Sequence, residues 1–223
     1  MLSDMFYKLW QSGTLTLGIW ETVYMTLIST VIAYVIGLPL GIVLWVTDRG
    51  GLHPVRWLNS VLGFIVNVFR SIPFIILMVA MLPAAKAIVG TSMGNKAMIV
   101  TLIIAAAPYV ARMVESSVKE VDSGVIEAAQ SMGATTGQIV WKVLLPEAMP
   151  GIVAGLTISF VSLTGYSAMA GAVGGGGLGD LGIRYGYQRF LPDVMLAVVV
   201  ILIVFVQAIQ SLGDWVVRRM SHR

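Results

Sequence analysis

The chain is short of the residues on which most soluble enzymes depend. Its 223 residues include no cysteine, two histidines and only 11% charged side chains, whereas soluble domains carry about 25%. The lack of cysteine excludes disulfides, thiolate metal sites and thiol nucleophiles. His53 and His222 are far apart and have neither the HExxH spacing nor a companion carboxylate, so we expect no catalytic metal.

Nucleotide-binding signatures are absent or out of context. A Walker phosphate loop requires Gly-Lys followed by Ser or Thr, and the sequence contains no Gly-Lys pair. Gly174, Gly176 and Gly179 have the spacing of a dinucleotide fingerprint, but they follow an apolar run rather than the buried strand of a soluble βαβ unit. We therefore expect a chain that is not an enzyme and holds no cofactor, and we interpret these glycines as a flexible turn or a close helix approach.

Apolar residues are abundant. They make up 57% of the chain and give it a mean hydropathy of +0.89. Runs with few or no charges extend over residues 22–47, 57–85, 97–111, 148–179 and 194–213. A membrane-spanning helix needs about 20 residues, so the third run must borrow from residues 94–96 or 112–113 and the fourth must include a loop. We predict an all-α polytopic membrane bundle of five helices, forming one domain over residues 1–223.

Basic residues gather at the ends of these runs. Placing residues 49–56, residues 112–142 and the C-terminal tail in the cytoplasm collects eight Lys and Arg residues there, against five outside. This bias predicts an external N-terminus and a cytoplasmic C-terminus. Lipid head groups account for the net charge of +3, so we expect no nucleic-acid partner. The N-terminal segment, with Asp4 and Lys8, does not have the form of a removable signal peptide.

Arg70 is a charge well inside an apolar run. Insertion scales put the cost of a central arginine at roughly 2.5 to 3.5 kcal/mol. We favour a structural explanation: Pro73 lacks an N–H and so frees the Phe69 carbonyl, which the guanidinium can bond, or the side chain can snorkel toward the cytoplasm. A contact with the substrate or with a coupling ion is the alternative.

Residues 127–146, EAAQSMGATTGQIVWKVLLP, interrupt the apolar chain with two short half-polar helices. For the first helix, Asp122, Ser123 and Gly124 are candidate N-caps, and Gly133 suits a left-handed stop. The sequence therefore predicts a helix of about two turns over residues 125–132.

The second short helix begins at a predicted capping box formed by Thr135 and Gln138. Apolar residues 139, 140, 143 and 144 share one face, and we expect Pro146 to end the run. Helices this short need support, because about 12 to 15 residues are marginal even in favourable peptides. An amphipathic connector at the membrane surface and a docking element for a partner are about equally favoured by these properties.

The same stretch resembles the EAA signature of the membrane subunits of bacterial ATP-binding-cassette importers. That signature reads Glu-Ala-Ala, three residues, Gly, nine residues, Ile, one residue, Leu-Pro, and only the Ile position differs here, as Val143. The segments FRSIPFIIL, IVGTS, APYVARMVE, GYSAMAGAVG and GGLG resemble permease subunits of methionine importers. The resemblance covers essentially the whole chain and implies a permease of the bacterial inner membrane, with a cytoplasmic EAA loop at about residues 114–150.

The resemblance also implies partners. The permease would pair with itself around a central path, bind two cytoplasmic ATPase subunits that hold the ATP and Mg²⁺, and receive methionine from an extracytoplasmic binding lipoprotein. Residues carried over as ATPase contacts are Glu127, Ala128, Ala129 and Met132, with Gly133 making the turn.

In this family the helix after the signature lines the path. The candidates for gate and path are therefore Tyr166, Ser167 and Met169, with ordinary bundle packing as the alternative for Met169. Methionine, D or L, is the implied cargo, and another amino acid or a short peptide is the alternative. A stand-alone secondary transporter is disfavoured, because the apolar runs contain almost no charges that could relay ions.

Overall fold

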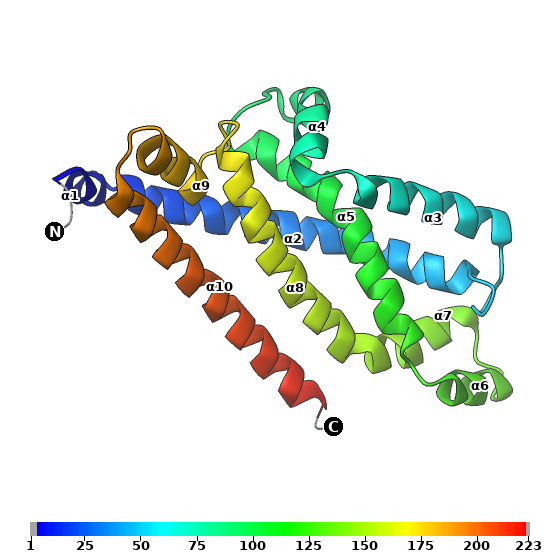
Figure 1. The fold of residues 1–223 in the computed structure, drawn as a ribbon. Helices are drawn as coiled ribbons and strands as arrows, with labels where there is room; N and C mark the ends of the chain where they lie inside the picture. Colours follow the sequence, from blue (N-terminus) through cyan, green and yellow to red (C-terminus); the bar gives the residue numbers. More distant parts are fainter. Residues whose placement is uncertain (1–3, 222–223) are drawn as a thin grey trace.

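A computed structural model describes residues 4–221, with the side chains of residues 7–220. Every regular element in this range is a helix, which confirms the predicted all-α class (Figure 1). The α-helices are α1 (Asp4–Gln11), α2 (Thr14–Thr47), α3 (Arg56–Ser71), α4 (Phe74–Val89), α5 (Asn95–Lys119), α6 (Ser123–Ser131), α7 (Thr136–Ile139), α8 (Leu145–Gly171), α9 (Gly177–Leu181) and α10 (Pro192–Ser221). Two π-helical segments, η1 (Val140–Leu144) and η2 (Gly182–Tyr187), follow α7 and α9.

Four long helical segments in the described residues are apolar enough to cross a membrane, and a bent pair supplies a fifth candidate. The bent pair is α3 and α4: the helix axis changes direction by 110° between them. Pro73 cannot continue α3 and holds the preceding residue, Ile72, in an extended conformation, with φ −82° and ψ 127°. The run predicted over residues 57–85 is therefore broken rather than straight.

Two helices extend beyond their apolar runs. Helix α5 spans 25 residues because it borrows from both flanks, as the short third run requires. Helix α2 begins at Thr14, eight residues before the predicted start of the run at Thr22, and so includes Glu21. The Glu21 carboxylate accepts a hydrogen bond of 2.8 Å from the Gly177 N–H, which explains how a charge is accommodated there.

Helices α2 and α5 approach closely at two glycines one turn apart. A Cβ atom on Gly37 would lie 2.9 Å from the Ala107 carbonyl oxygen, and one on Gly41 would lie 2.5 Å from the Ala111 carbonyl oxygen. A spacing of four between small residues on both helices is the pattern by which membrane helices bring their backbones together. This contact lies in the centre of the bundle, where α4 and α8 also pack on α5.

The glycine-rich segment between α8 and α9 turns the chain sharply. Gly174, Gly176 and Gly177 all have positive φ, between 75° and 84°. Gly171 and Gly179 bring the two helices so close that a Cβ atom on either would overlap backbone atoms of the other segment. The predicted turn and close helix approach are thus confirmed.

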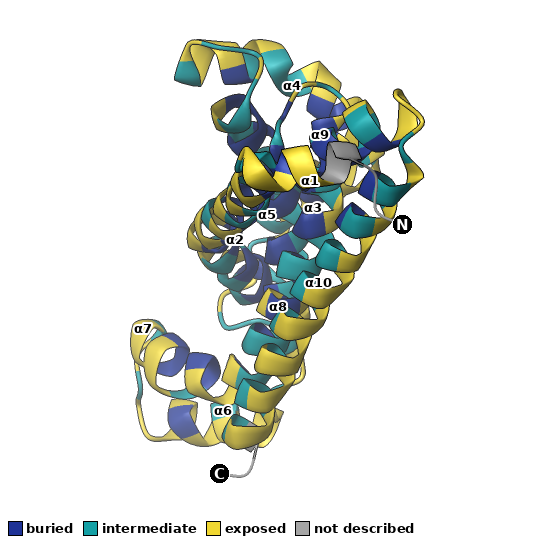
Figure 2. Ribbon diagram, turned by 90° about the vertical axis from the view of Figure 1, so that its left-hand side faces the viewer, coloured by how far each residue is buried: buried dark blue, intermediate teal, exposed yellow. Residues whose placement is uncertain are grey.

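The outside of the bundle is apolar along most of its length. Large exposed side chains include Val35 on α2 and Leu196 and Val204 on α10. Figure 2 shows α10 as a largely exposed rod on one side of the molecule. Such a surface is suited to lipid or to another subunit.

Candidate functional site

The two short helices of the EAA segment lie together at one end of the bundle (Figure 1). Helix α6 begins at Ser123, two residues before the predicted start, and Asp122 is the one of the three candidate caps that is used: its Oδ1 atom accepts a 2.6 Å hydrogen bond from the Gly124 N–H. It ends in a left-handed turn at Gly133, with φ +77°. The Gly133 N–H donates to the Gln130 carbonyl and the Ala134 N–H to the Ala129 carbonyl, which is the Schellman pattern.

Helix α7 begins at the predicted capping box. The Thr135 N–H donates to Gln138 Oε1 at 2.8 Å, and the Gln138 N–H donates to Thr135 Oγ1 at 3.4 Å. His53, in the loop after α2, contacts the Thr136 hydroxyl through its Nε2 atom. Both short helices are therefore fixed by caps and are anchored to the body of the protein.

The expectation that Pro146 ends this helix is wrong. The helix widens into η1, where the Leu145 N–H donates to the Val140 carbonyl five residues back, and then continues as α8 to Gly171. Pro146 lies in the first turn of α8. A π-turn gives the extra room that a proline ring needs within a helix. The EAA segment thus passes into α8 without a loop.

The exposed face of α6 carries most of the residues predicted to contact a partner. Met132 is 81% exposed, and Glu127 and Ala128 are exposed beside it. Ala129 is different, since it is only 4% exposed and faces the body of the protein. Its small side chain lets α6 lie close to the bundle, so the structure gives it a positioning role rather than a free contact surface.

Glu127 also borders a hollow of about 350 Å³ between α6 and the loop that follows α2. Polar groups on its walls come from α5, α6 and that loop. The side chains and loop glycines around it are Trp45, Asp48, Gly50, Gly51, Leu52, Lys119, Val121, Ser123, Ile126, Glu127 and Gln130.

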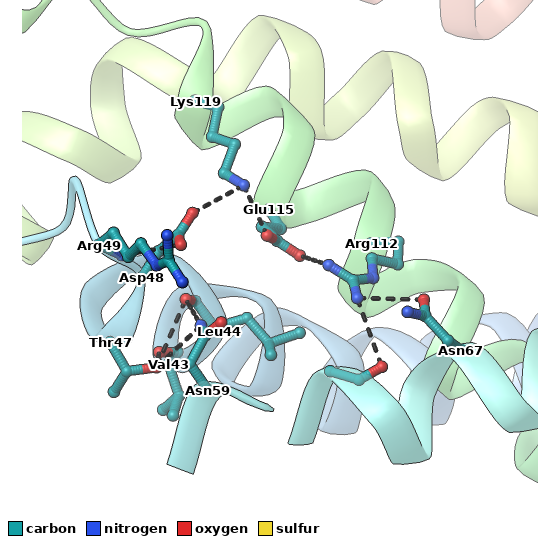
Figure 3. Close-up of polar contacts among 11 residues, drawn as sticks. Val43, Leu44, Thr47, Asp48, Arg49, Asn59, Asn67, Arg112, Glu115 and Lys119 are labelled. Carbon is teal, nitrogen blue, oxygen red and sulfur yellow. Dashed lines mark hydrogen bonds and ion pairs between the residues drawn. The ribbon is translucent and has the colours of Figure 1, made fainter. Parts of the chain in front are cut away.

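A chain of charged groups holds this end of α5 against α2 and α3 (Figure 3). Glu115 is buried and accepts hydrogen bonds from Arg112 Nη1 at 2.6 Å and from Lys119 Nζ at 2.8 Å. Lys119 Nζ is also 3.0 Å from Asp48 Oδ2, and Arg112 Nη2 donates to Asn67 Oδ1 at 3.0 Å. Three elements are therefore joined beside α6 by one network of ion pairs and hydrogen bonds.

The Asp48 end of this network predicts a dependence on pH. The hydrogen bond from Lys119, and then that from the Arg49 N–H, hold the pKa of the Asp48 carboxyl below its usual value of 3.8. Such a group stabilises the fold above pH 3.8 and loses that effect as the pH falls through its folded pKa. Asp48→Asn should therefore lower the unfolding temperature in detergent at about pH 6, and the effect should shrink at about pH 3. An effect of Asp48→Asn that is equal at both pH values contradicts this prediction.

A second site lies at the break between α3 and α4. A cavity of about 150 Å³ is enclosed there by these two helices together with α5 and α8. Its polar lining residues are Arg70, Tyr109, Ser159, Ser162 and Tyr166. Its apolar lining residues are Phe69, Ile72, Phe74, Leu77, Ala105, Ala106 and Leu163.

Comparison with known proteins decides what kind of protein carries these two sites. Residues 33–222 match the family described as the inner membrane component of binding-protein-dependent transport systems. The chain belongs to this family. It is 53% identical over 212 residues to the probable D-methionine transport system permease protein MetI of Vibrio cholerae, covering 95% of this chain and 94% of that protein. It is 45% identical over 180 residues to the methionine import system permease protein MetP of Bacillus subtilis, covering 81% of each.

Solved structures of ABC transporters have the same fold as this chain. The permease chain superposes on a chain of the inward-facing MetNI methionine ABC transporter with a TM-score of 0.93 and 49% identity, covering 98% and 99% of the two chains. An amino acid ABC transporter crystallised with histidines gives a TM-score of 0.79 at 19% identity, covering 98% and 100%. The second likeness shows the fold alone. The family confirms that this is a multi-pass inner membrane permease.

The predicted gate residues of the permease divide between two environments. Tyr166 lines the cavity and stacks on Phe74, with ring centroids 4.3 Å apart and planes 6° apart. Met169 is exposed one turn further along α8. Ser167 is buried, and its hydroxyl donates to the Thr164 carbonyl of its own helix at 2.8 Å. Tyr166 and Met169 therefore share an open face of α8, whereas Ser167 points away from it.

Arg70 of the permease does not make the contact that the sequence suggested. Within residues 4–221, no hydrogen bond or ion pair joins its guanidinium to the Phe69 carbonyl or to any other group. The chain turns by 110° just after Arg70, so the side chain is exposed at the cavity instead of lying along a straight helix.

Sequence reasoning misses the ion-pair network of the permease. The apolar run stops at Ala111, the span predicted from the sequence extends to residue 113 at most, and residues 112–142 are assigned to the cytoplasm. Helix α5 in fact continues for two more turns, to Lys119. The spacing of Arg112, Glu115 and Lys119, at i, i+3 and i+7, places them on one helix face, and this was the signal available in the sequence.

Proposed function

We propose that this permease forms the translocation path of an ATP-driven importer for methionine, D or L. The observation that carries the proposal is its similarity over almost its full length to permeases named for methionine transport, together with the TM-score of 0.93 to the MetNI transporter. The cavity beside α8 and the exposed α6 support the proposal, since such a subunit needs a path and a point of attachment for its ATPase.

The proposal includes the partners that the resemblance implies. Two copies of the chain, each a single membrane domain, would surround the path, with the EAA loop and C-terminus in the cytoplasm and the N-terminus outside. Two ATPase subunits would hold ATP and Mg²⁺ and bind α6. An extracytoplasmic lipoprotein would deliver methionine at the opposite end, near α1 and α9, which lie far from α6 in Figure 1.

In this mechanism the chain transmits motion rather than performing chemistry. ATP binding in the partner draws the two α6 helices together. Because α6 is fixed by its caps and α7 passes without a loop into α8, the displacement reaches the face of α8 that carries Tyr166 and Met169. Rotation of rigid subunits about an interface is an established form of switching. Hydrolysis then allows the path to reset.

Met132 tests the coupling role. We expect Met132→Asp to lower ATP-driven methionine uptake by about tenfold or more, because a charge would replace an apolar contact at the centre of a docking surface. The fold should be unaffected, since 81% of the side chain is exposed. The measurements are uptake into proteoliposomes containing the ATPase, with the binding protein added, and co-purification of the ATPase with the permease.

A matched control is Glu120→Gln, which alters an exposed residue at the end of α5 near α6. This control should transport as the unaltered protein does. Normal uptake and normal ATPase stimulation in Met132→Asp overturn the coupling role of α6. Uptake by this chain alone in liposomes would instead support a secondary transporter, and uptake of other amino acids or peptides in preference to methionine would support a different cargo.

A further inference from the structure

Arg70 is an exposed cation at the cavity between α3 and α4, without a hydrogen-bond or ion-pair partner in the described part of the chain. It is the fifteenth residue of α3, so at 1.5 Å per residue it lies about 21 Å along the helix from Arg56. That distance is most of the about 30 Å thickness of a hydrocarbon core. Within residues 7–220, whose side chains the structure describes, no acidic group pairs with Arg70, so its guanidinium can bind an anion that enters the cavity.

The cavity beside Arg70 also contains a buried hydroxyl to which no group in the described residues donates a hydrogen bond. Ser159 is 1% exposed, and its Oγ atom makes no hydrogen bond within the described part of the chain. The Tyr34 hydroxyl lies beside it and donates to the Ile152 carbonyl at 3.4 Å, so Tyr34 can accept a hydrogen bond from Ser159 but does not donate one to it. The Ser159 oxygen can therefore accept a hydrogen bond from a donor on a bound ligand.

The size and lining of the cavity define the ligand. Its volume is about 150 Å³, and an apolar cavity of about 150 Å³ in another protein is large enough for benzene. The flat wall formed by the stacked rings of Phe74 and Tyr166 is apolar, whereas the hydroxyls of Tyr109, Ser159 and Ser162 can accept hydrogen bonds. The lining of the cavity therefore offers a guanidinium, an apolar surface and hydroxyl acceptors.

We propose that this cavity is a binding site for the transported amino acid within the membrane, in which Arg70 pairs with the substrate carboxylate. The planar guanidinium can bind a carboxylate through two parallel hydrogen bonds. The unbranched thioether side chain lies against Phe74 and Tyr166, and the ammonium group reaches the hydroxyls on α5 and α8. This inference rests on the proposed import of methionine and adds a site at which the substrate binds during its passage.

The absence of cysteine from the chain allows a direct test. Ser162→Cys places a single thiol in the cavity wall, and its labelling by a water-soluble maleimide is followed on the permease band of the purified complex with its ATPase, without the binding protein. We expect methionine to slow this labelling. Arg70→Gln in the same background should raise the half-protecting methionine concentration by about tenfold or more, because a charge-assisted hydrogen bond is lost. Arg70→Lys, which keeps the charge without the planar fork, should give an intermediate value.

Three controls separate the site from indirect effects. Met93→Cys, in the exposed loop between α4 and α5, should be labelled at the same rate with and without methionine. Lys86→Gln, which removes an exposed cation from α4 outside the cavity, should leave the protection of Ser162→Cys unchanged. The amine 3-(methylthio)propylamine, which has the side chain but no carboxylate, should protect Ser162→Cys weakly, and equally with and without the Arg70→Gln change.

Two results overturn the inference. One is a lack of protection by methionine at any concentration in a complex that imports methionine when the binding protein is added. The other is that methionine protects Ser162→Cys from labelling equally well when Arg70→Gln is also present. In that case Arg70 binds a lipid phosphate or has a structural role instead of binding the substrate. In both cases ATP-driven methionine uptake by the unaltered protein still supports the proposed function. The proposed function itself fails only if the unaltered protein, supplied with the ATPase and the binding protein, does not import methionine.

Discussion

Replacing Gly41 by leucine should prevent the permease from accumulating as a stable folded protein. A Cβ atom at this position would lie 2.5 Å from the Ala111 carbonyl oxygen and 2.8 Å from the Val114 Cβ atom. The first obstacle is backbone of α5, which cannot move aside as a side-chain tip can. Overpacking of this kind costs about 3 kcal/mol or more, a large share of the about 5 to 15 kcal/mol by which proteins are usually stable.

The comparison for Gly41→Leu is Gly137→Leu in α7. An added Cβ at Gly137 would meet nothing within 4 Å, so this change should leave the unfolding temperature in detergent close to that of the unaltered protein. Gly41→Ala should be intermediate, because it adds the colliding atom but no further bulk. Membrane yield, monodispersity and unfolding temperature are the measurements. Equal stability of Gly41→Leu and Gly137→Leu would show that α2 and α5 do not meet as described.

Removal of the Glu115 carboxylate should cause the second largest loss. Glu115→Ala leaves Arg112 and Lys119 without the group that neutralises both, and breaking a buried ion pair from one side costs about 3 to 5 kcal/mol. The lower end applies here, because the Arg112 and Lys119 side chains are 27% and 47% exposed and can regain water. The loosened end of α5 is next to α6, so uptake should fall together with the unfolding temperature.

Glu120→Gln is again the control, since it removes a carboxylate from the exposed end of the same helix. Glu115→Leu adds a further comparison, because it replaces the carboxylate with an apolar group that still fills space but leaves the two cations unpaired. It should be nearly as damaging as Glu115→Ala. If Glu115→Ala unfolds at the same temperature as Glu120→Gln, the network contributes nothing measurable to stability.

Local features of this fold could be predicted from the sequence, because they depend on residues close together in the chain. The Asp122 cap, the turn at Gly133 and the capping box at Thr135 each involve groups within a few residues of one another. The continuation of the helix past Pro146 was not predicted, because a proline reads as a stop unless a π-turn makes room for it.

Features that depend on residues far apart in the chain were harder to predict from the sequence. Glu21 falls outside the first predicted span because nothing near it in sequence satisfies a charge, yet its partner is the Gly177 N–H, 156 residues away. Pro73 indicated a break, but the angle of 110° depends on how α4 packs against α5. The cavity combines residues from four helices, so its existence beside Arg70 could not be deduced from any one run.

The direct passage from α7 through η1 into α8 joins the second short helix to α8 as one continuous helical rod. Helix α8 has 27 residues, so it is about 40 Å long at 1.5 Å per residue. A rod of that length converts a tilt of about 5° at one end into a displacement of about 3.5 Å at the other end. That displacement is comparable to the width of a methylene chain, so only a small tilt of α8 would be needed to open or close the proposed path.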